Sequence, residues 1–162
     1  MPNSYDAAKS EASVLGIDVA KHHVVLFDSV RRTTHQIDNH PSALIRALRR
    51  YRHYELAVCE TTGGFERALC EAATQVGLPI HRAHASCVKA YIASHGQGAK
   101  TDAIDACWLA RYGQERGSSL PRWQAPDPDS EALAHLIRHR QNLVKQRTQA
   151  RNQLQAPNGQ IL

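Results

Sequence analysis

Residues 14–29 read Val-Leu-Gly-Ile-Asp-Val-Ala-Lys-His-His-Val-Val-Leu-Phe-Asp-Ser, and this stretch decides how the fold begins. Two β-branched, apolar runs at 14–19 and 24–29 flank a short polar segment, the pattern of a β-hairpin. Residues 33–38 can add a third antiparallel strand. We therefore expect the chain to open with an antiparallel sheet.

The residues that follow alternate between helix and strand patterns. Residues 39–42 break the strand pattern and start a helix. Strands are expected at 55–60 and 78–83, with helices at about 64–76, 86–94 and 102–115. In the first of these helices, Phe65 is expected on the inner face and Glu66 in solvent. Antiparallel strands followed by strand–helix units predict an α/β fold with a mixed sheet and flanking helices. This is the element order of the ribonuclease-H-like fold.

The second half of the chain has a different organisation. We expect a first domain at 13–116, a proline-containing linker at 117–129 and one long helix at 130–156. A terminal helix with an apolar stripe has to bury that stripe. The stripe predicts a partner helix, from a second copy of the chain or from downstream sequence. The same helix carries candidate nucleic-acid contacts at Arg138, Arg140, Lys145, Arg147 and Arg151.

Composition sets broad limits on function. The 162 residues are 42% hydrophobic and 22% charged, with a net charge of +5, a moderate lean toward a polyanionic partner. No apolar run reaches the roughly 20 residues of a membrane span, and no secretory signal is visible. We expect a cytoplasmic protein with no membrane partner. The four cysteines lack metal-site spacing and are expected to be buried free thiols.

Four carboxylates form the strongest functional pattern. Asp18 and Glu60 each follow an apolar run, so each is expected at the rim of a sheet. Asp102 and Asp105 lie three residues apart and share one face of a helix. Acids on separate elements can hold the oxygen-seeking Mg²⁺ or Mn²⁺ of a phosphodiester-cleaving enzyme. Taken singly, each acid has a structural alternative, such as a turn contact or a favourable place in a helix first turn.

Three sequence motifs carry a resemblance to a known family. Gly-Ile-Asp-Val-Ala-Lys (16–21), Cys-Glu-Thr-Thr-Gly-Gly-Phe (59–65) and Lys-Thr-Asp-Ala-Ile-Asp-Ala (100–106) are similar to the acidic motifs of the insertion-sequence-110 transposases. These are also called DEDD transposases and include the Piv-type invertases. Leu-Pro-Arg-Trp (120–123) and residues 132–144 resemble the segments that follow in that family.

The resemblance implies a RuvC-like domain in which Asp18, Glu60, Asp102 and Asp105 bind divalent metal. It implies a prokaryotic protein that takes part in DNA strand cleavage and exchange, with a guide RNA as a further partner. It also implies homo-oligomers assembled through the helical segment, a coiled coil. Family members continue into a second domain with a serine nucleophile, and we expect this chain to correspond to their N-terminal half. Lys21 and Lys100 lie beside the acids, where they can contact phosphate.

Three alternatives remain open from the residues. The chain can be a stand-alone RuvC-like endonuclease acting on branched DNA. It can instead be a non-catalytic module for nucleic-acid binding and dimerisation, with the acids a relic. An actin-like ATPase is disfavoured, because the residues after Asp18 are Val19, Ala20 and Lys21, not the small and hydroxyl residues that hold phosphate.

Overall fold

The computed structural model describes residues 12–96 and 102–155, without the side chains of residues 102 and 103. The chain forms two compact units, one up to Gln124 and one from Ala125 onward. No helix among the described residues combines the length and the apolar character that a membrane span requires.

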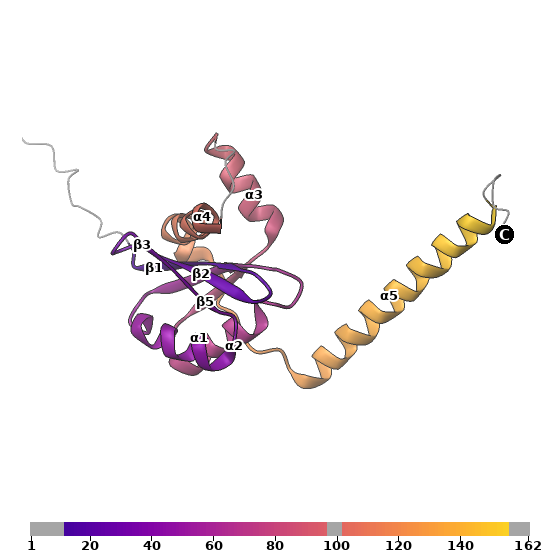
Figure 1. Cartoon of the computed structure of the whole chain (residues 1–162), viewed down its shortest axis with the longest axis horizontal. Helices are drawn as coiled ribbons and strands as arrows, with labels where there is room; N and C mark the ends of the chain where they lie inside the picture. Colours follow the sequence, from indigo (N-terminus) through magenta and orange to yellow (C-terminus); the bar gives the residue numbers. More distant parts are fainter. Residues whose placement is uncertain (1–11, 97–101, 156–162) are drawn as a thin grey trace, which may run out of the picture. The chain divides into compact units, whose positions relative to one another are not determined.

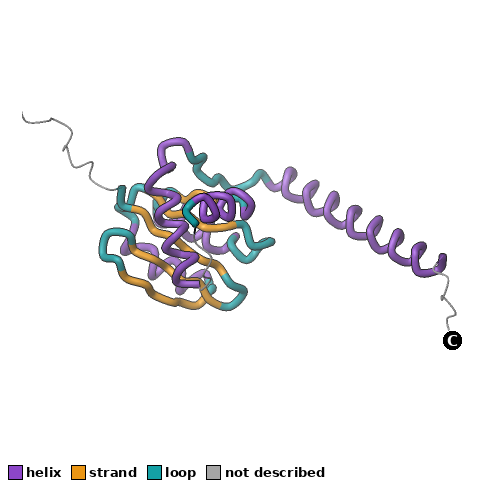
Figure 2. Tube along the Cα trace, turned by 90° about the horizontal axis from the view of Figure 1, so that it is seen from above, coloured by secondary structure: helices purple, strands orange, loops and turns teal. Residues whose placement is uncertain are grey.

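The first unit is built on one five-stranded mixed sheet (Figures 1 and 2). Its strands lie in the order β3-β2-β1-β4-β5. The antiparallel part consists of β1 (Val14–Val19), β2 (His23–Asp28) and β3 (Thr33–Asp38). The parallel part continues from β1 to β4 (Leu56–Glu60) and β5 (Ile80–Ala83). The predicted opening by three antiparallel strands is confirmed.

Helices cover both faces of this sheet. On one face lie α1 (Pro41–Leu48) and α2 (Arg67–Val76), and on the other lie α3 (Ala85–Ser94) and α4 (Asp102–Arg116), as Figure 1 shows. Two short 3₁₀ turns, η1 (Arg49–Tyr51) and η2 (Gly117–Ser119), follow α1 and α4. With the long helix α5 (Pro128–Gln155), these elements confirm the predicted α/β architecture.

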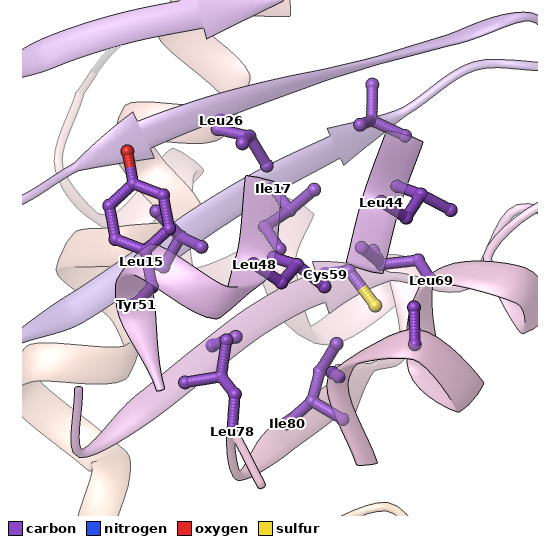
Figure 3. Packing of buried hydrophobic residues seen from close by; sticks show 14 of the residues in the cluster. Leu15, Ile17, Leu26, Leu44, Leu48, Tyr51, Cys59, Leu69, Leu78 and Ile80 are labelled. Carbon is purple, nitrogen blue, oxygen red and sulfur yellow. The ribbon is translucent and has the colours of Figure 1, made fainter. Parts of the chain in front are cut away.

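Alternation along the strands sends side chains to two separate cores. Leu15 and Ile17 point to the α1/α2 face and pack with Leu44, Leu48 and Leu69 (Figure 3). Val14 of the same strand points to the α4 face and packs in the second core. Since successive side chains of a strand point to opposite faces, Asp18 also points toward the α4 face.

Helix α4 approaches β1 at backbone distance. A Cβ added to Gly16 would lie 1.9 Å from the Ala106 carbonyl oxygen and 2.5 Å from the Ala110 nitrogen. A Cβ added to Gly113 would lie 2.7 Å from side-chain atoms of Val14 and Val58. Glycine at these two positions therefore allows α4 to sit directly on the centre of the sheet.

The chain returns to the sheet after α4. The Trp123 amide donates to the Ile80 carbonyl at 2.7 Å, and the His81 Nδ1 lies 2.8 Å from the Pro121 carbonyl. Burial lowers the pKa of His81 and outweighs the opposing effect of this hydrogen bond. Residues 120–123 are thus fastened to the outer strand β5 of the first unit.

Two expectations about buried side chains are wrong. Phe65 was expected on the inner face of a helix from residue 64, but α2 begins at Arg67 and Phe65 is 47% exposed. Cys59 and Cys70 are buried free thiols, as expected, whereas Cys87 and Cys107 are exposed free thiols on helices α3 and α4. Their apolar sequence neighbours lie on other sides of those helices.

Helix α5 belongs to the second unit. All its residues but one are exposed, and none is buried. Large apolar side chains recur along it without cover: Leu133, Leu136, Ile137, Leu143, Val144 and Leu154.

Candidate functional site

Two of the predicted acids stand side by side at the ends of parallel strands. The β1–β4 register pairs Ile17 with Cys59, so the next residues, Asp18 and Glu60, are neighbours across the two strands. Neighbouring strands lie roughly 5 Å apart. Both side chains are half-buried and belong to the α4 face by alternation. Strand ends and register thus bring together two acids that are 42 residues apart in sequence.

Helix α4 adds a third acid to the same place. Asp105 directly precedes Ala106, whose carbonyl lies against Gly16, two residues before Asp18. Asp18, Glu60 and Asp105 line one pocket of about 270 Å³. Its other lining residues are Thr62, Val88, Lys89, Ile92 and Leu109. The close approach at Gly16 therefore sets the position of Asp105 relative to the strand-end acids.

The donors in this pocket are chemically suited to a hard cation. All three acids offer oxygen ligands, and Mg²⁺ is commonly held by only one or two carboxylates together with water and phosphate. Among the side chains that the structure describes, no three His, Cys, Asp or Glu residues lie close enough together to enclose a metal ion. Asp102 begins α4 one turn before Asp105, and its side chain lies outside the described residues.

The loop after Glu60 is held by another carboxylate. Glu66 was expected to be solvated, but it is only 4% exposed. Its Oε2 accepts hydrogen bonds from the Thr62 hydroxyl at 2.8 Å and from the Gly64 amide at 2.9 Å. Burial by itself raises the pKa of Glu66, but hydrogen bonds from its own amide, from Thr62 and from Gly64 outweigh this effect, and the pKa lies below its ordinary value. Glu66 therefore shapes the loop that leaves the pocket.

Asn39 connects this loop to the end of the first strand. Its Nδ2 donates to the Ala20 carbonyl at 2.9 Å and to the Phe65 carbonyl at 3.1 Å. The turn after Asp18 and the loop after Glu60 are thereby tied to one side chain. This contact supports the two strand-end acids from outside the pocket.

Asp28 is a buried carboxylate away from the pocket, at the β2–β3 turn. It is 1% exposed and accepts hydrogen bonds from the Tyr54 hydroxyl at 2.6 Å and from the amides of Val30 and Arg31 at 3.0 and 2.9 Å. Burial alone would raise the pKa of Asp28, but the hydrogen bonds from Arg31, Tyr54 and Val30 bring it below its ordinary value. Asp28 has the partners of a structural acid.

Lys89 is the pocket residue that sequence reasoning missed. It lies on α3, exposed, and lines the pocket together with the three acids. No motif marks it, and α3 reaches the pocket only through the tertiary fold. Its ammonium group places a positive charge at the rim of an acidic pocket.

The predicted nucleic-acid contacts are scattered over the chain. Lys21 is exposed in the turn between β1 and β2, and Lys100 lies outside the described residues. The five basic residues predicted on the long helix are all exposed on α5: Arg138, Arg140, Lys145, Arg147 and Arg151.

Comparisons with known proteins agree with this geometry. Residues 15–157 match the sequence model of the insertion-sequence-110 DEDD family, whose description is "transposase". The first unit resembles Thermus thermophilus RuvC in complex with a Holliday junction substrate, with 16% identity, a TM-score of 0.52, and coverage of 69% of this chain and 99% of that one. Another Thermus thermophilus RuvC structure aligns with 17% identity, a TM-score of 0.49, and coverage of 68% and 99%. No significantly similar sequence is found among curated proteins. At such low identity the likeness to RuvC shows a shared fold.

Proposed function

The chain belongs to the insertion-sequence-110 family of DEDD transposases, and we propose that its first unit binds Mg²⁺ or Mn²⁺ and acts on DNA phosphodiesters during strand cleavage and exchange. The observation that carries this proposal is that Asp18, Glu60 and Asp105 line the same pocket. Asp102 is proposed as the fourth ligand from its place one turn before Asp105.

Each pocket residue has a role in this proposal. A bound divalent ion would supply charge that stabilises the phosphate being cut. Asp18 and Glu60 would hold it from the strand ends, and Asp105 from the helix. Lys89 would contact a non-bridging phosphate oxygen, which keeps the DNA strand over the acids despite their negative charge. Without a cation the acids repel one another, so metal and DNA are expected to bind together.

DNA is the proposed substrate for two reasons. The chain's family is described as a transposase, and the structural relative with a TM-score of 0.52 is bound to a Holliday junction. Lys21 lies in the turn that follows Asp18, and Lys100 precedes Asp102 by two residues, so both are proposed as phosphate contacts beside the acids. A guide RNA is proposed as a second nucleic-acid partner of the basic helix α5.

Metal-dependent DNA binding tests the proposal. The 162-residue chain is titrated with a fluorescent four-way junction in Ca²⁺, which supports binding without cleavage, and in EDTA. Wild type should bind at least tenfold more tightly in Ca²⁺, and this difference should vanish in Glu60→Gln and Asp102→Ala. Glu71→Gln, an exposed acid on α2, is the control and should behave as wild type. Equal affinity of wild type in Ca²⁺ and EDTA would contradict the proposal.

Cleavage distinguishes the stand-alone endonuclease. Nicking of a four-way junction by the purified chain in Mn²⁺, abolished in Glu60→Gln, would show that these residues suffice for cutting. Metal-dependent binding without nicking would instead limit the role of these residues to holding metal and DNA.

Helix α5 supports a second role, in assembly. Leu136 and Leu143 are seven residues apart, and so are Ile137 and Val144, so exposed apolar side chains recur at heptad spacing in the middle of α5. We propose that α5 pairs with α5 of a second copy. Sedimentation should show a concentration-dependent dimer that is lost in Leu136→Ser/Leu143→Ser, while a monomer at all concentrations would remove this role.

A further inference from the structure

We infer that a groove between the edge strand β3 and helix α1 binds the sugar–phosphate backbone of a double-stranded nucleic acid, at a site separate from the acidic pocket. The groove has a volume of about 450 Å³. Its polar lining comes from His35, Gln36, Asp38, Arg46, Arg50 and Tyr51. The inference rests on the proposed role in nucleic-acid chemistry and extends it to a second surface.

Charge is concentrated around this groove. Residues 31–54 contain six arginines and one acid, Asp38, so this segment alone carries a charge equal to the +5 of the whole chain. The remaining residues carry equal numbers of basic and acidic side chains. A local excess of this size attracts a polyanion. The arginines are Arg31, Arg32, Arg46, Arg49, Arg50 and Arg52.

Most of these charges are available to a ligand. Arg31 pairs with the buried Asp28 at 3.2 Å. Within the described part of the chain, no carboxylate lies at ion-pair distance from the other five. Arg46 and Arg50 are exposed, lie four residues apart on consecutive helical turns and both line the groove. Asp38 reduces the positive charge of the lining but does not cancel it.

The edge strand adds backbone donors to this surface. Strand β3 pairs with β2 and is the outermost strand of the sheet, so its outer edge presents main-chain amides beside the groove. Phosphate oxygens are commonly bound by guanidinium groups, side-chain amides and backbone amides together. Arg46, Arg50, Gln36 and the β3 edge provide this set of donors.

The lining favours a duplex over a single strand. Single-stranded nucleic acids are usually held by exposed aromatic side chains on which bases stack. Tyr51, the one Phe, Tyr or Trp residue in the lining of this groove, is 6% exposed and belongs to the α1/α2 core. Guanidinium groups can bind backbone phosphates in a bidentate manner, and this contact does not require unstacked bases.

The groove and the acidic pocket lie on opposite faces of the sheet. Leu26 and Ile37, which line the groove, pack in the α1/α2 core. Val88 and Leu109, which line the acidic pocket, pack in the α4 core. A backbone held in the groove is therefore a different segment from the strand at the acids, such as a flanking duplex arm.

The competing explanation is protection of the sheet edge. Charged side chains beside an edge strand prevent edge-to-edge association and need no ligand. Under that explanation, neutralising Arg46 and Arg50 promotes aggregation and leaves nucleic-acid affinity unchanged.

The test measures the salt dependence of binding in EDTA, so that it does not involve the metal site. The 162-residue chain is titrated with a 30-base-pair DNA duplex, a 30-base-pair RNA duplex and a single strand. R46Q/R50Q should weaken duplex binding by tenfold or more near 0.1 M salt, and should reduce the salt slope by about 1.8 if two phosphate contacts are lost. Whichever duplex binds more tightly, DNA or RNA, is the nucleic acid whose backbone the groove prefers.

Two matched variants distinguish a loss specific to the groove from a general loss of positive charge. R67Q/R111Q also removes two positive charges, from arginines that pair with Glu71 and Glu115 on other helices, and should change affinity less than threefold. R46K/R50K keeps the charge and should retain the wild-type salt slope. Equal losses in R46Q/R50Q and R67Q/R111Q, unchanged affinity in R46Q/R50Q, or tighter binding of the single strand would each overturn the inference. If the wild-type chain does not bind metal but R46Q/R50Q behaves as expected, the acidic site is contradicted and the groove is not.

Discussion

Two pairs of carboxylates in the first unit have contrasting surroundings. Asp28 and Glu66 are buried, and backbone amides and hydroxyl groups of nearby residues donate to them. Asp18 and Glu60 are half-buried at strand ends and line a pocket with Asp105. The first pair holds a turn and a loop of the fold in place. The second pair faces space that a cation and a phosphate can occupy.

The largest stability effect is expected at Asp28. Asp28→Ala leaves the Tyr54 hydroxyl and two amides without their buried acceptor, and should cost about 3 kcal/mol of unfolding free energy. Urea denaturation measures the loss. The matched control Asp38→Ala changes an exposed acid and should stay within about 0.5 kcal/mol of wild type. Equal losses in both variants would mean that Asp28 is not a structural acid.

Gly16→Ala should affect fold and pocket together. The new methyl group would overlap the backbone of α4, so the helix must move away from β1, at a cost of about 2 kcal/mol. Displacement of α4 carries Asp105 away from Asp18, so Mn²⁺ affinity should fall as well. Gly117→Ala is the control, because its Cβ would make an ordinary 3.5 Å contact with Leu56. Unchanged thermal stability in Gly16→Ala would contradict the close packing of α4.

The sequence predicted the strand-end acids because their signal is local. An apolar run that ends in an acid fixes both the strand and the side chain's place on its rim, as at Asp18 and Glu60. Register between β1 and β4, which makes them neighbours, depends on tertiary pairing that no local pattern contains. The position of Asp105 near Asp18 and Glu60 likewise depends on how α4 packs at Gly16.

The errors also have a physical reason. Glu66 was expected in solvent because it lies in a helical sequence pattern. The helix instead begins at Arg67, and Glu66 accepts hydrogen bonds from the amides of Thr62 and Gly64. Lys89 carries no motif and joins the pocket only because α3 packs beside α4. Burial of a polar side chain depends on partners that are distant or conformation-dependent, which residue types alone do not specify.

The contribution of Glu66 to the unfolding free energy should depend on pH. Its pKa is lower in the folded state than in the unfolded chain, so its stabilisation is present at neutral pH and is lost as the pH falls through the folded-state pKa. Glu66→Gln should therefore cost about 1 kcal/mol at pH 7, and this cost should shrink as the pH falls below the ordinary glutamate pKa of 4.5. Denaturation of both proteins across this range measures the difference, with Glu71→Gln as the exposed control. A difference that stays constant with pH would exclude a role for the carboxylate charge.

Metal binding by the strand-end acids is the central claim, and isothermal titration of the 162-residue chain with Mn²⁺ tests it most directly. Wild type and Glu71→Gln, which changes an exposed acid on α2, should bind Mn²⁺ with similar affinity. Glu60→Gln should bind at least tenfold more weakly while keeping its unfolding free energy within about 0.5 kcal/mol of wild type. Equal Mn²⁺ binding by wild type and Glu60→Gln would contradict the account.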